Sequence, residues 1–576
     1  MKKKGAQLIV EALKAEGVDT VFGYPGGHVI PIFDVLYSEP SIHVVLTRHE
    51  QGAVHAADGY ARSTGKTGVC IVTSGPGATN TVTGLATANF DSVPIVCISG
   101  QVPRNMIGND AFQEADTCGI TRPVTKHNYL VTDRRELGAM LKNAFYIASS
   151  GRPGPVVVDV PGDISKEAHE DEYPDHPDIR GYRPLPELDR EMVEQAAAAL
   201  NAAERPVFFI GGGMHISCAD EIFKKIVRRF PAPVVSSLMG IGILPYDHPL
   251  FLGMLGMHGT YPANMAVSDA DLLFSIGVRF DDRATGALEK FAPRAKIVHV
   301  DIDPTAIARN VPVEIPVVGD AAEVLEALYP LLKKPDIGDW IERIEEWKGE
   351  HPLKKTGKGE FLHPGTIIDA ISTEFPDALI TTEVGQNQMW TALFYRFKAP
   401  RTWLTSGGLG TMGYGFPAAI GAQIGNPGRR VIDIAGDGSI QMNIQELATA
   451  VTEGLPVIIA VLNNGFLGMV RQWQQLFYER RYSSTCLNPE RSCPDITTDD
   501  GKTLSYTPDF VRLAEAYGAK GIRITREDEI VPSLREAKKI TDRPIVLEFI
   551  IEREANVYPM VAPGAGIMDM MFGEEE

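Results

Sequence analysis

The sequence predicts an α/β fold made of three domains with parallel β-sheets, and three observations support this prediction. Short apolar runs typical of buried strands alternate with helix-like segments along almost the whole chain. The chain has 576 residues, too many for one core, because domains contain about 150 residues each. Two stretches without regular patterning, the Pro- and Asp-rich residues 172–187 and the charged residues 333–363, divide the chain into three blocks.

These blocks set the expected domain boundaries. The first domain should span residues 1–165 and the second 190–335, while the third should span 364–552 and lead into a C-terminal tail, 553–576. The segment 333–363 is expected to be weakly structured. The first and third domains could share a fold, which sequence periodicity alone cannot reveal. The runs expected to form buried strands are 68–73, 94–99, 207–210, 272–276, 297–300, 431–435 and 457–462.

Composition describes an ordinary globular chain and excludes several partners. Hydrophobic residues make up 44% and charged residues 22% of the chain, which is typical. The net charge of −19 makes nucleic acid and anionic membrane surfaces poor partners, and no apolar run is long enough to span a bilayer. The six cysteines contain no CxxC pair, and Cys70 and Cys97 are expected to be core thiols. The N-terminus should form an amphipathic helix, not a signal peptide, so a cytoplasmic location is expected.

The most informative stretch is Gly436-Asp437-Gly438, which is followed 27 positions later by Asn463-Asn464. Each segment follows an expected buried strand, and apolar residues at helical spacing lie between them from Ile444 to Val451. Asp437 and Asn464 should therefore lie at the carboxyl ends of two parallel strands, where open α/β sheets bind ligands. Their oxygens suit Mg²⁺, which usually keeps phosphate oxygens in its coordination shell. The alternative is a glycine-rich turn whose aspartate only caps a helix.

A second carboxylate, Glu50, follows an apolar run and begins an expected helix. On this fact alone a structural role is the simpler interpretation, because a glutamate in the first helical turn is stabilised by the helix dipole. The neighbouring His49 and His55 carry no clear signal of a direct role.

Further segments are spread over nearly the whole chain, namely GYPGG, RHEQGA, TSGPGATN, GQVPRNMIGNDAFQE, SGRPGPVVVDVP, GVRFDDRATG, SGGLGTMGYG and GMVRQWQ. Together with the GDG and NN segments, their order and spacing resemble the acetolactate synthase (acetohydroxyacid synthase) family of thiamin-diphosphate-dependent enzymes, in particular its large catalytic subunit. The resemblance implies three α/β domains: a pyrimidine-binding domain, a central Rossmann-like domain associated with FAD, and a domain that binds diphosphate and Mg²⁺.

The resemblance implies a reaction and its central residues. The enzyme would decarboxylate pyruvate on thiamin diphosphate and transfer the hydroxyethyl unit to a second pyruvate or to 2-oxobutyrate, as in branched-chain amino-acid biosynthesis. Glu50 would contact the aminopyrimidine of the cofactor as a catalytic carboxylate. Asp437, Asn464 and the backbone carbonyl of Phe466 would bind Mg²⁺.

Other positions would hold the cofactor itself. Met412 matches the bulky residue that supports a bent cofactor, and an unbranched thioether suits such a wedge. The carbonyl of Gly410 would accept the amino group of the pyrimidine. The chain departs from the family at Asn387, where histidine is common; we expect Asn387 to donate to a phosphate with a modest change in affinity. The positions matching the diphosphate-contacting segments are Val384, Gly385, Gln386, Asn387, Gln388, Gly436, Gly438 and Ser439.

The resemblance also implies where the 2-oxoacids bind. Gly27 and Gln113 would line the reaction space, with Phe112 close to it. Arg283 would recognise the acceptor, because a guanidinium binds a carboxylate with two parallel hydrogen bonds. Without the resemblance, an ion pair with a neighbouring aspartate, Asp281 or Asp282, is the simpler interpretation of Arg283.

Two residues near the C-terminal end match positions that favour 2-oxobutyrate over pyruvate. These are Met469 and Trp473, both in the GMVRQWQ segment. An apolar pocket that contacts one extra methylene provides roughly 1–3 kcal/mol of discrimination. Without the resemblance, Trp473 would be an ordinary surface or core aromatic residue.

The middle block lacks a GxGxxG motif and has only FFIGGGMH, so from spacing alone a dinucleotide site is weakly supported. The resemblance implies a bound FAD with no net redox role. Glycine-rich turns allow close approach of the backbone to a pyrophosphate. The positions that match flavin-contacting segments are Arg152, Gly253, Met257, His258, Gly259, Thr260, Asp301, Ile302 and Asp320.

Quaternary structure and alternatives follow from the same resemblance. Glu50 of one subunit and the metal motif of another would form each site, which implies a homodimer or homotetramer, with a small regulatory subunit as a further expected partner. Two further features depart from the family: His28 replaces a small residue, and the segment 486–510 is longer than usual. The alternatives are a catabolic FAD-free acetolactate synthase, a pyruvate oxidase-like flavoenzyme or other thiamin-dependent carboligase, and an inactive scaffold paralogue.

Overall fold

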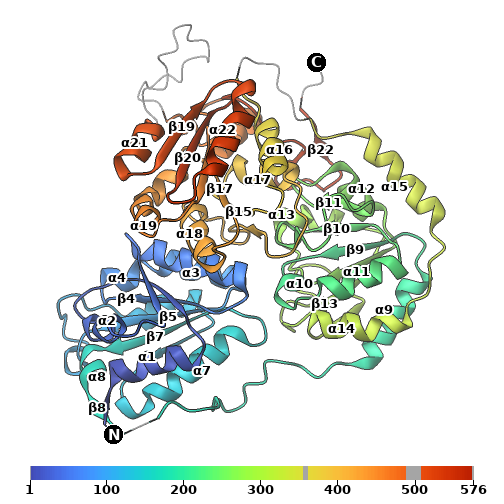
Figure 1. Ribbon diagram of the computed structural model, residues 1–576. Coiled ribbons are helices and arrows are strands. Elements are labelled where there is room, and N and C mark those ends of the chain that lie inside the picture. Colours follow the sequence, from blue (N-terminus) through green and yellow to red (C-terminus); the bar gives the residue numbers. More distant parts are fainter. Residues whose placement is uncertain (1, 171, 355–360, 488–507, 574–576) are drawn as a thin grey trace.

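A computed structural model describes residues 2–170, 172–354, 361–487 and 508–573. These residues form three units, each with a six-stranded parallel sheet covered by helices (Figure 1). The predicted fold class, α/β with three parallel-sheet domains, is therefore confirmed. The long segment noted at 486–510 lies mostly outside the described residues.

The N-terminal unit, blue in Figure 1, has the strand order β3-β2-β4-β5-β7-β6. Its central strands β4 and β5 are buried along their whole length, as expected for a sheet covered on both faces. The strands are β2 (Thr20–Tyr24), β3 (His43–Leu46), β4 (Gly68–Val72), β5 (Ile95–Gln101), β6 (His127–Leu130) and β7 (Pro155–Pro161). The α-helices are α1 (Gly5–Ala15), α2 (Ile30–Tyr37), α3 (Glu50–Thr64), α4 (Pro76–Thr79), α5 (Val82–Phe90), α6 (Thr117–Thr121), α7 (Leu137–Ser149) and α8 (Gly162–Lys166).

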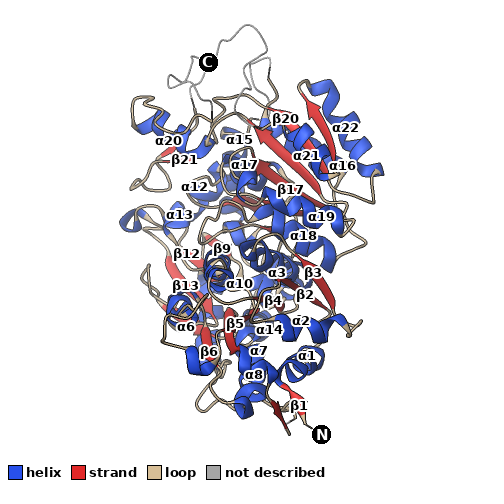
Figure 2. Cartoon of the chain, turned by 90° about the vertical axis from the view of Figure 1, so that its left-hand side faces the viewer, coloured by secondary structure: helices blue, strands red, loops and turns tan. Residues whose placement is uncertain are grey.

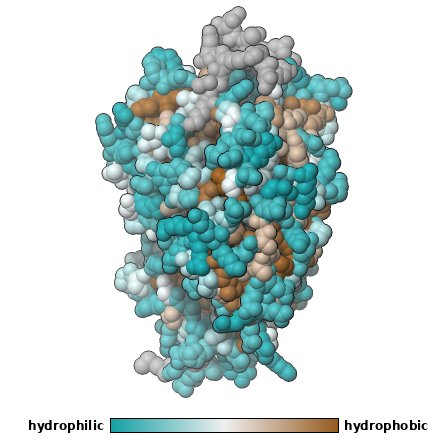
Figure 3. All heavy atoms as spheres, turned by 90° about the vertical axis from the view of Figure 1, so that its right-hand side faces the viewer, coloured by the Kyte–Doolittle hydropathy of each residue, from teal (hydrophilic) through white to brown (hydrophobic). Residues whose placement is uncertain are grey.

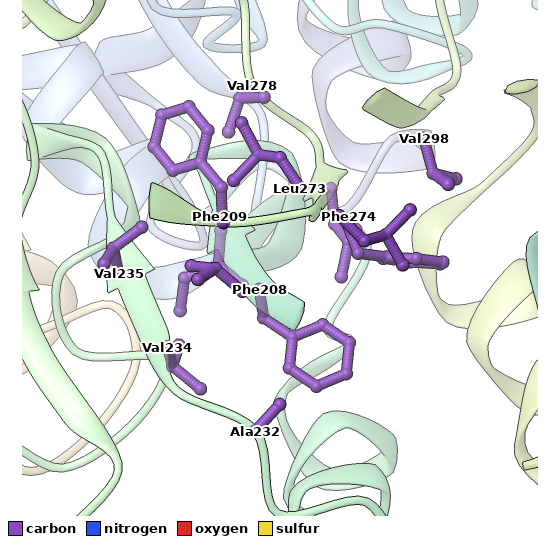
Figure 4. Close-up of a cluster of buried hydrophobic side chains, with 14 of the residues drawn as sticks. Phe208, Phe209, Ala232, Val234, Val235, Leu273, Phe274, Val278 and Val298 are labelled. Atoms are coloured by element: carbon purple, nitrogen blue, oxygen red, sulfur yellow. The ribbon is translucent and has the colours of Figure 1, made fainter. Parts of the chain in front are cut away.

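The central unit, green in Figure 1, has the order β11-β10-β9-β12-β13-β14. Counted within this unit, the order is 3-2-1-4-5-6, that of doubly wound dinucleotide-binding sheets. Its core packs around β9 and β12, and Figure 4 shows Phe208 and Phe209 pointing to opposite faces of the sheet. The strands are β9 (Pro206–Ile210), β10 (Val234–Ser236), β11 (Phe251–Met254), β12 (Leu272–Ile276), β13 (Lys296–Asp301) and β14 (Ile315–Val318). The α-helices are α9 (Arg190–Ala202), α10 (Gly213–Ile216), α11 (Asp220–Arg229), α12 (Tyr261–Asp269), α13 (Asp282–Thr285), α14 (Ala321–Leu328) and α15 (Gly338–Glu350).

The C-terminal unit, orange to red in Figure 1, has the order β16-β15-β17-β18-β20-β19. Counted within each unit, this order and that of the N-terminal sheet are both 2-1-3-4-6-5, so the first and third units share one topology. The strands are β15 (Leu379–Thr382), β16 (Trp403–Leu404), β17 (Val431–Gly436), β18 (Ile458–Asn463), β19 (Lys520–Ile524) and β20 (Ile545–Ile550). The α-helices are α16 (Pro364–Glu374), α17 (Gln386–Phe394), α18 (Gly415–Gly425), α19 (Leu447–Thr452), α20 (Gly468–Phe477), α21 (Phe510–Tyr517) and α22 (Glu527–Lys539).

Short elements complete the chain. The chain ends of the first unit pair as a two-stranded antiparallel sheet, β1 (Lys3–Lys4) with β8 (Ala168–His169). In the C-terminal tail, β21 (Met560–Val561) pairs with β22 (Met570–Met571). The 3₁₀ turns are Arg104–Met106, Arg122–Val124, Arg134–Glu136, Leu238–Gly240, Leu288–Lys290, Tyr329–Leu331, Ile440–Met442 and Ile444–Glu446.

The segment 333–363 was expected to be weakly structured, and this prediction is wrong. It contains the 13-residue helix α15, at the outer edge of the central unit in Figure 1. Trp340, Ile344 and Trp347 recur at helical spacing and are buried. Trp340 also donates its indole N–H to the carbonyl of Pro206 at 3.2 Å. The many charges of this stretch concealed an amphipathic helix whose apolar side is narrow.

Helices α3 and α18 join the first and third units (Figure 1). Helix α3 begins after His49, whose ring accepts the backbone N–H of Gln51, and ends at Gly65 with φ +79°. Both helices are rich in glycine and alanine, so their backbones approach closely. A Cβ on Gly421 would lie 1.8 Å from the carbonyl oxygen of Ala56, and one on Gly59 would lie 2.1 Å from that of Ala418.

We expect Gly421→Ala to destabilise the protein by about 1–3 kcal/mol, because the added methyl forces the two helices apart in a packed core. The apparent melting temperature should fall by about 2–4 °C for each kcal/mol in a domain of this size. Thermal unfolding of the wild type, of Gly421→Ala and of a control variant at equal protein concentration measures this fall. Gly428→Ala is the matched control, since a Cβ there meets nothing within 4 Å. Equal melting temperatures would refute the close contact.

The tail after β20 packs between the central and C-terminal units. Figure 2 shows β21 beside α20 and α12. Val561 donates its N–H to the carbonyl of Met257 at 2.8 Å, and Gln472 on α20 donates to the carbonyl of Val557 at 3.0 Å. The face of the molecule drawn in Figure 3 is predominantly hydrophilic, with scattered apolar residues. Among the described residues, no helix has the length and apolar character needed to cross a membrane.

Candidate active site

Asp437 and Asn464 lie directly after β17 and β18, two neighbouring strands of the C-terminal sheet. Asp437 is 1% and Asn464 5% exposed, so both side chains face the interior of this edge. Gly465 donates its N–H to Asp437 Oδ2 at 3.0 Å, and Phe466 donates to Asn464 Oδ1 at 2.9 Å. Asp437 does not cap a helix, since the following element is a 3₁₀ turn with no side-chain cap. The structure thus brings together the residues predicted to bind a metal ion.

The chemistry of this edge fits a divalent cation and an anionic cofactor. Burial raises the pKa of Asp437 to about 7, and a bound cation would favour its charged form. Gln386 Oε1 is buried without a hydrogen-bond partner. A Cβ on Gly468 would lie 2.2 Å from this oxygen and 2.9 Å from Asn464 Nδ2, so the two amides converge there. Helix α17 begins at Gln386, and a helix N-terminus favours phosphate.

Asn387 corrects one expectation about phosphate binding. Its side-chain nitrogen donates to the carbonyls of Glu383 at 2.8 Å and Ile434 at 2.7 Å. Both amide hydrogens are therefore used by the backbone, and the side chain does not offer a hydrogen to a phosphate in this structure. The reason is position: Asn387 is the second residue of α17, and its amide lies against the end of β17. Gln388 is likewise occupied, donating to Thr405 Oγ1 at 2.7 Å.

Gly410 and Met412 lie on residues 405–414, which we name the cofactor loop. Gly410 has φ +73° and an exposed backbone, and a Cβ there would meet no atom within 4 Å. Met412 is half-buried. Beneath the loop, the buried carboxylate of Glu383 accepts the N–H groups of Gly413 and Phe416. Burial raises the pKa of Glu383 to about 8.

Glu50 is the first residue of α3 and is half-buried. Its Oε2 accepts a hydrogen bond from Asn80 Nδ2 at 3.0 Å. The chain just before it is held from the C-terminal unit, since Arg48 donates its N–H to Glu446 Oε1 at 2.9 Å. Glu50 is thus a positioned carboxylate at the carboxyl edge of the first sheet, next to the loop after β4.

Other predicted residues of the first unit lie at exposed places. A Cβ on Gly27 would meet no atom within 4 Å, so the loop after β2 faces open space. Phe112 is 86% exposed, and the adjacent Gln113 has φ +60°. In the single chain, these residues have no described contact with Asp437 or Asn464.

Arg283, from the central unit, and Trp473, from the C-terminal unit, lie in contact with each other. The guanidinium carbon of Arg283 lies 5.8 Å from the centre of the Trp473 ring, a cation–π distance. Its Nη1 lies 3.7 Å from the sulfur of Met257. The alternative ion pair is also present, with Asp282 at 3.8 Å, but both side chains are exposed and such pairs contribute little. Met469 lies one turn before Trp473 on α20 and is half-buried.

The predicted flavin residues gather around the central sheet. Arg152, from the first unit, donates to Asp303 Oδ2 at 3.1 Å, close to the end of β13. Gly253, with φ +102°, packs against Thr260, whose methyl carbon would lie 2.7 Å from a Cβ at that glycine. Gly259 lies in the loop after β11, and Ile302 lies in the loop after β13. Open sheets bind dinucleotides at such loops.

Three of these residues also have structural partners. Asp320 caps α14, accepting the N–H of Ala322 at 3.0 Å and the hydroxyl of Ser217 at 2.7 Å. His258 is buried with Nδ1 3.2 Å from the carbonyl of Pro559, and burial lowers its pKa to about 4. Asp301 Oδ1 accepts the N–H of Asp303 at 2.9 Å, and burial raises the pKa of Asp301 to about 6. Asp320 is therefore occupied as a helix cap.

Sequence reasoning missed several buried polar groups around the cofactor loop. They are Glu383, Asp433, Asp58, Arg62 and Asp91, all with no exposed or nearly no exposed side-chain surface. The one available signal was Asp433, a carboxylate inside the apolar run VIDIAG. The residues next to the other four do not mark them as buried in the sequence.

Comparison with known proteins agrees with this geometry. Three models of the thiamine pyrophosphate enzyme family match the chain: the N-terminal TPP binding domain at residues 3–120, the central domain at 193–328 and the C-terminal TPP binding domain at 383–549. The fold is thus that of a thiamine pyrophosphate enzyme.

Relatives along the full chain narrow this class. The chain is 48% identical to the acetolactate synthase large subunit of Corynebacterium glutamicum, covering 99% of this chain and 90% of the relative. It is 46% identical to that of Haemophilus influenzae, covering 100% and 99%. It is 45% identical to the acetolactate synthase isozyme 3 large subunit of Escherichia coli, covering 99% of each. The chain belongs to the acetolactate synthase large-subunit family of thiamine pyrophosphate enzymes.

Proposed function

We propose that this protein is an acetolactate-forming transferase. It removes CO₂ from pyruvate and transfers the remaining two-carbon unit to a second pyruvate or to 2-oxobutyrate, giving precursors of branched-chain amino acids. The observation that carries this proposal is the pairing of Asp437 and Asn464 at two adjacent strand ends, in a chain similar to acetolactate synthase large subunits over its full length.

The same edge supports Mg²⁺ and the diphosphate of the cofactor. Asp437, Asn464 and the carbonyl of Phe466 offer three hard oxygen ligands, and Mg²⁺ completes its shell with phosphate oxygens and water. The unpartnered Gln386 oxygen and the N-terminus of α17 lie beside them. Val384, Gly385, Gly436, Gly438 and Ser439 form the turns around this site.

Bound thiamin diphosphate supplies the nucleophilic carbon and the electron sink for decarboxylation. The chain would orient it: Gly410 would offer its carbonyl to the pyrimidine amino group, and Met412 would support the bound cofactor. Glu50 would hold a proton at N1′ of the pyrimidine. Within the described residues of a single chain, Glu50 has no contact with Asp437. We therefore propose that each site combines Glu50 of one subunit with the metal residues of another, in a homodimer or homotetramer.

The acceptor pocket is proposed at the contact between Arg283 and Trp473, with Met469 beside it and Gly27, Phe112 and Gln113 contributed across the subunit interface. Arg283 is exposed enough to bind a carboxylate, and the ring of Trp473 would fix the plane of its guanidinium group. His28, half-buried next to Gly27, would narrow the approach to this pocket.

We expect Trp473→Leu to reduce the preference for 2-oxobutyrate over pyruvate by roughly 10-fold, because the contact with one methylene is worth about 1–3 kcal/mol. Competition between the two acceptors, with products separated by chromatography, measures this ratio. Tyr478→Leu is the control and should keep the wild-type ratio, because Tyr478 is 55% exposed at the end of α20. An unchanged ratio in Trp473→Leu would remove Trp473 from the pocket.

FAD is proposed in the central unit. The support is the 3-2-1-4-5-6 strand order, whose reversal between β9 and β12 is where such sheets bind dinucleotides. Arg152, Gly253, Met257, His258, Gly259, Thr260, Asp301, Ile302 and Asp320 are the proposed surroundings.

The division into domains 1–165, 190–335 and 364–552 with the tail 553–576 also stands as a proposal, supported by the separate sheets. Helix α15, which follows residue 335, packs on the core of the central unit and would extend that domain. A small regulatory subunit is a proposed partner, since the relatives are named large subunits. A cytoplasmic location is supported by Cys70 and Cys97. They lie opposite each other on the neighbouring strands β4 and β5, and both are free thiols.

Product analysis tests the proposed reaction. The purified chain receives thiamin diphosphate, Mg²⁺, FAD, pyruvate and an equal amount of 2-oxobutyrate. Mostly 2-aceto-2-hydroxybutyrate with some acetolactate is the expected result. Acetolactate alone would keep the reaction and refute the acceptor preference. Acetate, acetyl phosphate or peroxide would show an oxidase instead, and bleaching of the flavin on turnover would agree with it.

A further inference from the structure

A network of buried charges joins helix α3 to the cofactor loop, residues 405–414. It consists of Asp58 and Arg62 on α3 and Asp91 after α5, all in the first unit. The side chains of Asp58 and Asp91 have no exposed surface, and that of Arg62 is 10% exposed. The proposed reaction uses none of these groups directly, so their burial needs another explanation.

Asp91 contacts the loop itself. Its Oδ2 accepts the N–H of Gly407 at 3.0 Å, and its Oδ1 accepts the N–H of Gly408 at 2.8 Å. These two glycines precede Gly410 by only a few residues. A Cβ on Gly408 would lie 2.9 Å from Asp91 Oδ1, so the carboxylate sits directly against the loop backbone. A side chain at Gly407 would meet Met239 of the central unit.

Arg62 ties Asp91 to the helix. It donates to Asp91 Oδ2 at 3.0 Å and, in a two-pronged pair, to Asp58 at 2.6 and 3.2 Å. It also donates to the carbonyl of Thr405 at 2.9 Å, the first residue of the loop. Although burial alone lowers the pKa of Arg62, the Asp58 carboxylate raises it well above its ordinary value.

Two further contacts reach the far end of the loop. Tyr414 donates its hydroxyl to Asp58 Oδ1 at 2.6 Å, and the Arg62 guanidinium lies 5.2 Å from the centre of the Tyr414 ring. Thr87 on α5 and Thr411 share a hydrogen bond of 2.7 Å between their hydroxyls. The loop is thus held at its beginning, middle and end by side chains of another unit of the same chain.

We infer that Asp91, Arg62 and Asp58 are positioning residues that fix the cofactor loop against the helix that begins with Glu50. This inference rests on the proposed function, in which Gly410 and Met412 contact thiamin diphosphate. A buried ion pair is a poor source of stability, but its directional hydrogen bonds define one geometry. Here that geometry sets the distance between the loop of one proposed site and Glu50 of the other.

Asp91→Asn tests the inference, because the amide keeps the shape but cannot accept both loop N–H groups. The purified variant is titrated with thiamin diphosphate at saturating Mg²⁺, following protein fluorescence and the near-ultraviolet circular dichroism of the bound cofactor. We expect the Kd to rise by about tenfold, which corresponds to about 1.4 kcal/mol. At saturating cofactor, the circular dichroism of the bound cofactor should still differ from that of the wild type. The fall in kcat should be larger than the change in KM for pyruvate.

Glu16→Gln is the matched control. It removes a half-buried carboxylate that pairs with Lys142 at 2.8 Å between α1 and α7, away from the loop. It should change thermal stability without changing the Kd or the dichroism. Thr87→Val is the second test variant. It removes the bond to Thr411, together with a bond of 2.9 Å to the carbonyl of Thr83 inside α5 that does not involve the loop. It should move the same readouts in the same direction by less.

Both outcomes are decisive. Wild-type Kd, dichroism and kcat in a folded Asp91→Asn variant, or in Thr87→Val where Asp91→Asn does not fold, would overturn the inference and leave acetolactate formation by the wild type untouched. If instead the wild type binds thiamin diphosphate but forms no acetolactate, the proposed reaction fails. The inference would then still stand on the altered dichroism of Asp91→Asn.

Discussion

Replacing Glu50 with glutamine is expected to lower kcat by about 10²–10⁴-fold, the contribution typical of a positioned acid or base. Glutamine keeps the length and the hydrogen bond from Asn80 but cannot exchange a proton with N1′ of the pyrimidine. Exchange of the C2 proton of bound thiamin diphosphate with deuterated water, followed by magnetic resonance, should slow by a similar factor. The Kd for the cofactor should change far less than kcat.

The control for this experiment is Glu221→Gln. Glu221 lies on α11 with 74% of its side chain exposed and pairs with Lys224, so its loss should leave kcat unchanged. A Glu50→Gln variant that keeps wild-type proton exchange would assign Glu50 a structural role at the start of α3. That was the simpler interpretation of the residue before its surroundings were considered.

The second large effect is expected for Asp437→Asn. The substitution removes the single carboxylate of the proposed Mg²⁺ site, while even partners outside the metal shell commonly contribute 10–100-fold in metal affinity. We therefore expect the Kd for thiamin diphosphate at fixed Mg²⁺ to rise by about 100-fold or more. Isothermal titration of the variant over a range of Mg²⁺ concentrations measures the change.

Asp528→Asn provides the comparison for this variant. Asp528 is an exposed residue of the same unit, paired with Arg526 at 2.9 Å, and its loss should affect neither ligand. Chelation of Mg²⁺ from the wild type should reproduce the defect of Asp437→Asn. Cofactor binding that is independent of both Asp437 and Mg²⁺ would contradict the proposed site.

Periodicity predicted the strands because buried parallel strands are continuous apolar runs. Residues 431–435 and 457–462 became β17 and β18 with shifts of one residue. The same criterion failed for α15, where three buried residues in thirteen are too few to stand out among charges. It could not order the strands either, since sheet order depends on contacts between residues far apart in the sequence.

The proposed metal-binding residues could be predicted from the sequence, whereas the residues that position the cofactor loop could not. Asp437 and Asn464 could be found because short chain segments link them to strand ends, so their spacing reports their geometry. Asp91 and Arg62 act on a loop more than 300 residues away. Nothing local distinguishes them from surface charges, and only the packing of the first unit against the third brings them to the loop.

The shared strand order of the first and third units has a consequence beyond the arrangement of the sheets. The polypeptide contains one architecture twice, and the two copies have diverged in the loops at one edge. One copy carries Glu50 after its second strand, while the other carries Asp437 after its third. In the proposed function, acid–base chemistry and cation binding are thereby divided between two versions of one scaffold. Each version can change its loops independently, provided that the helix pair joining them retains its glycines.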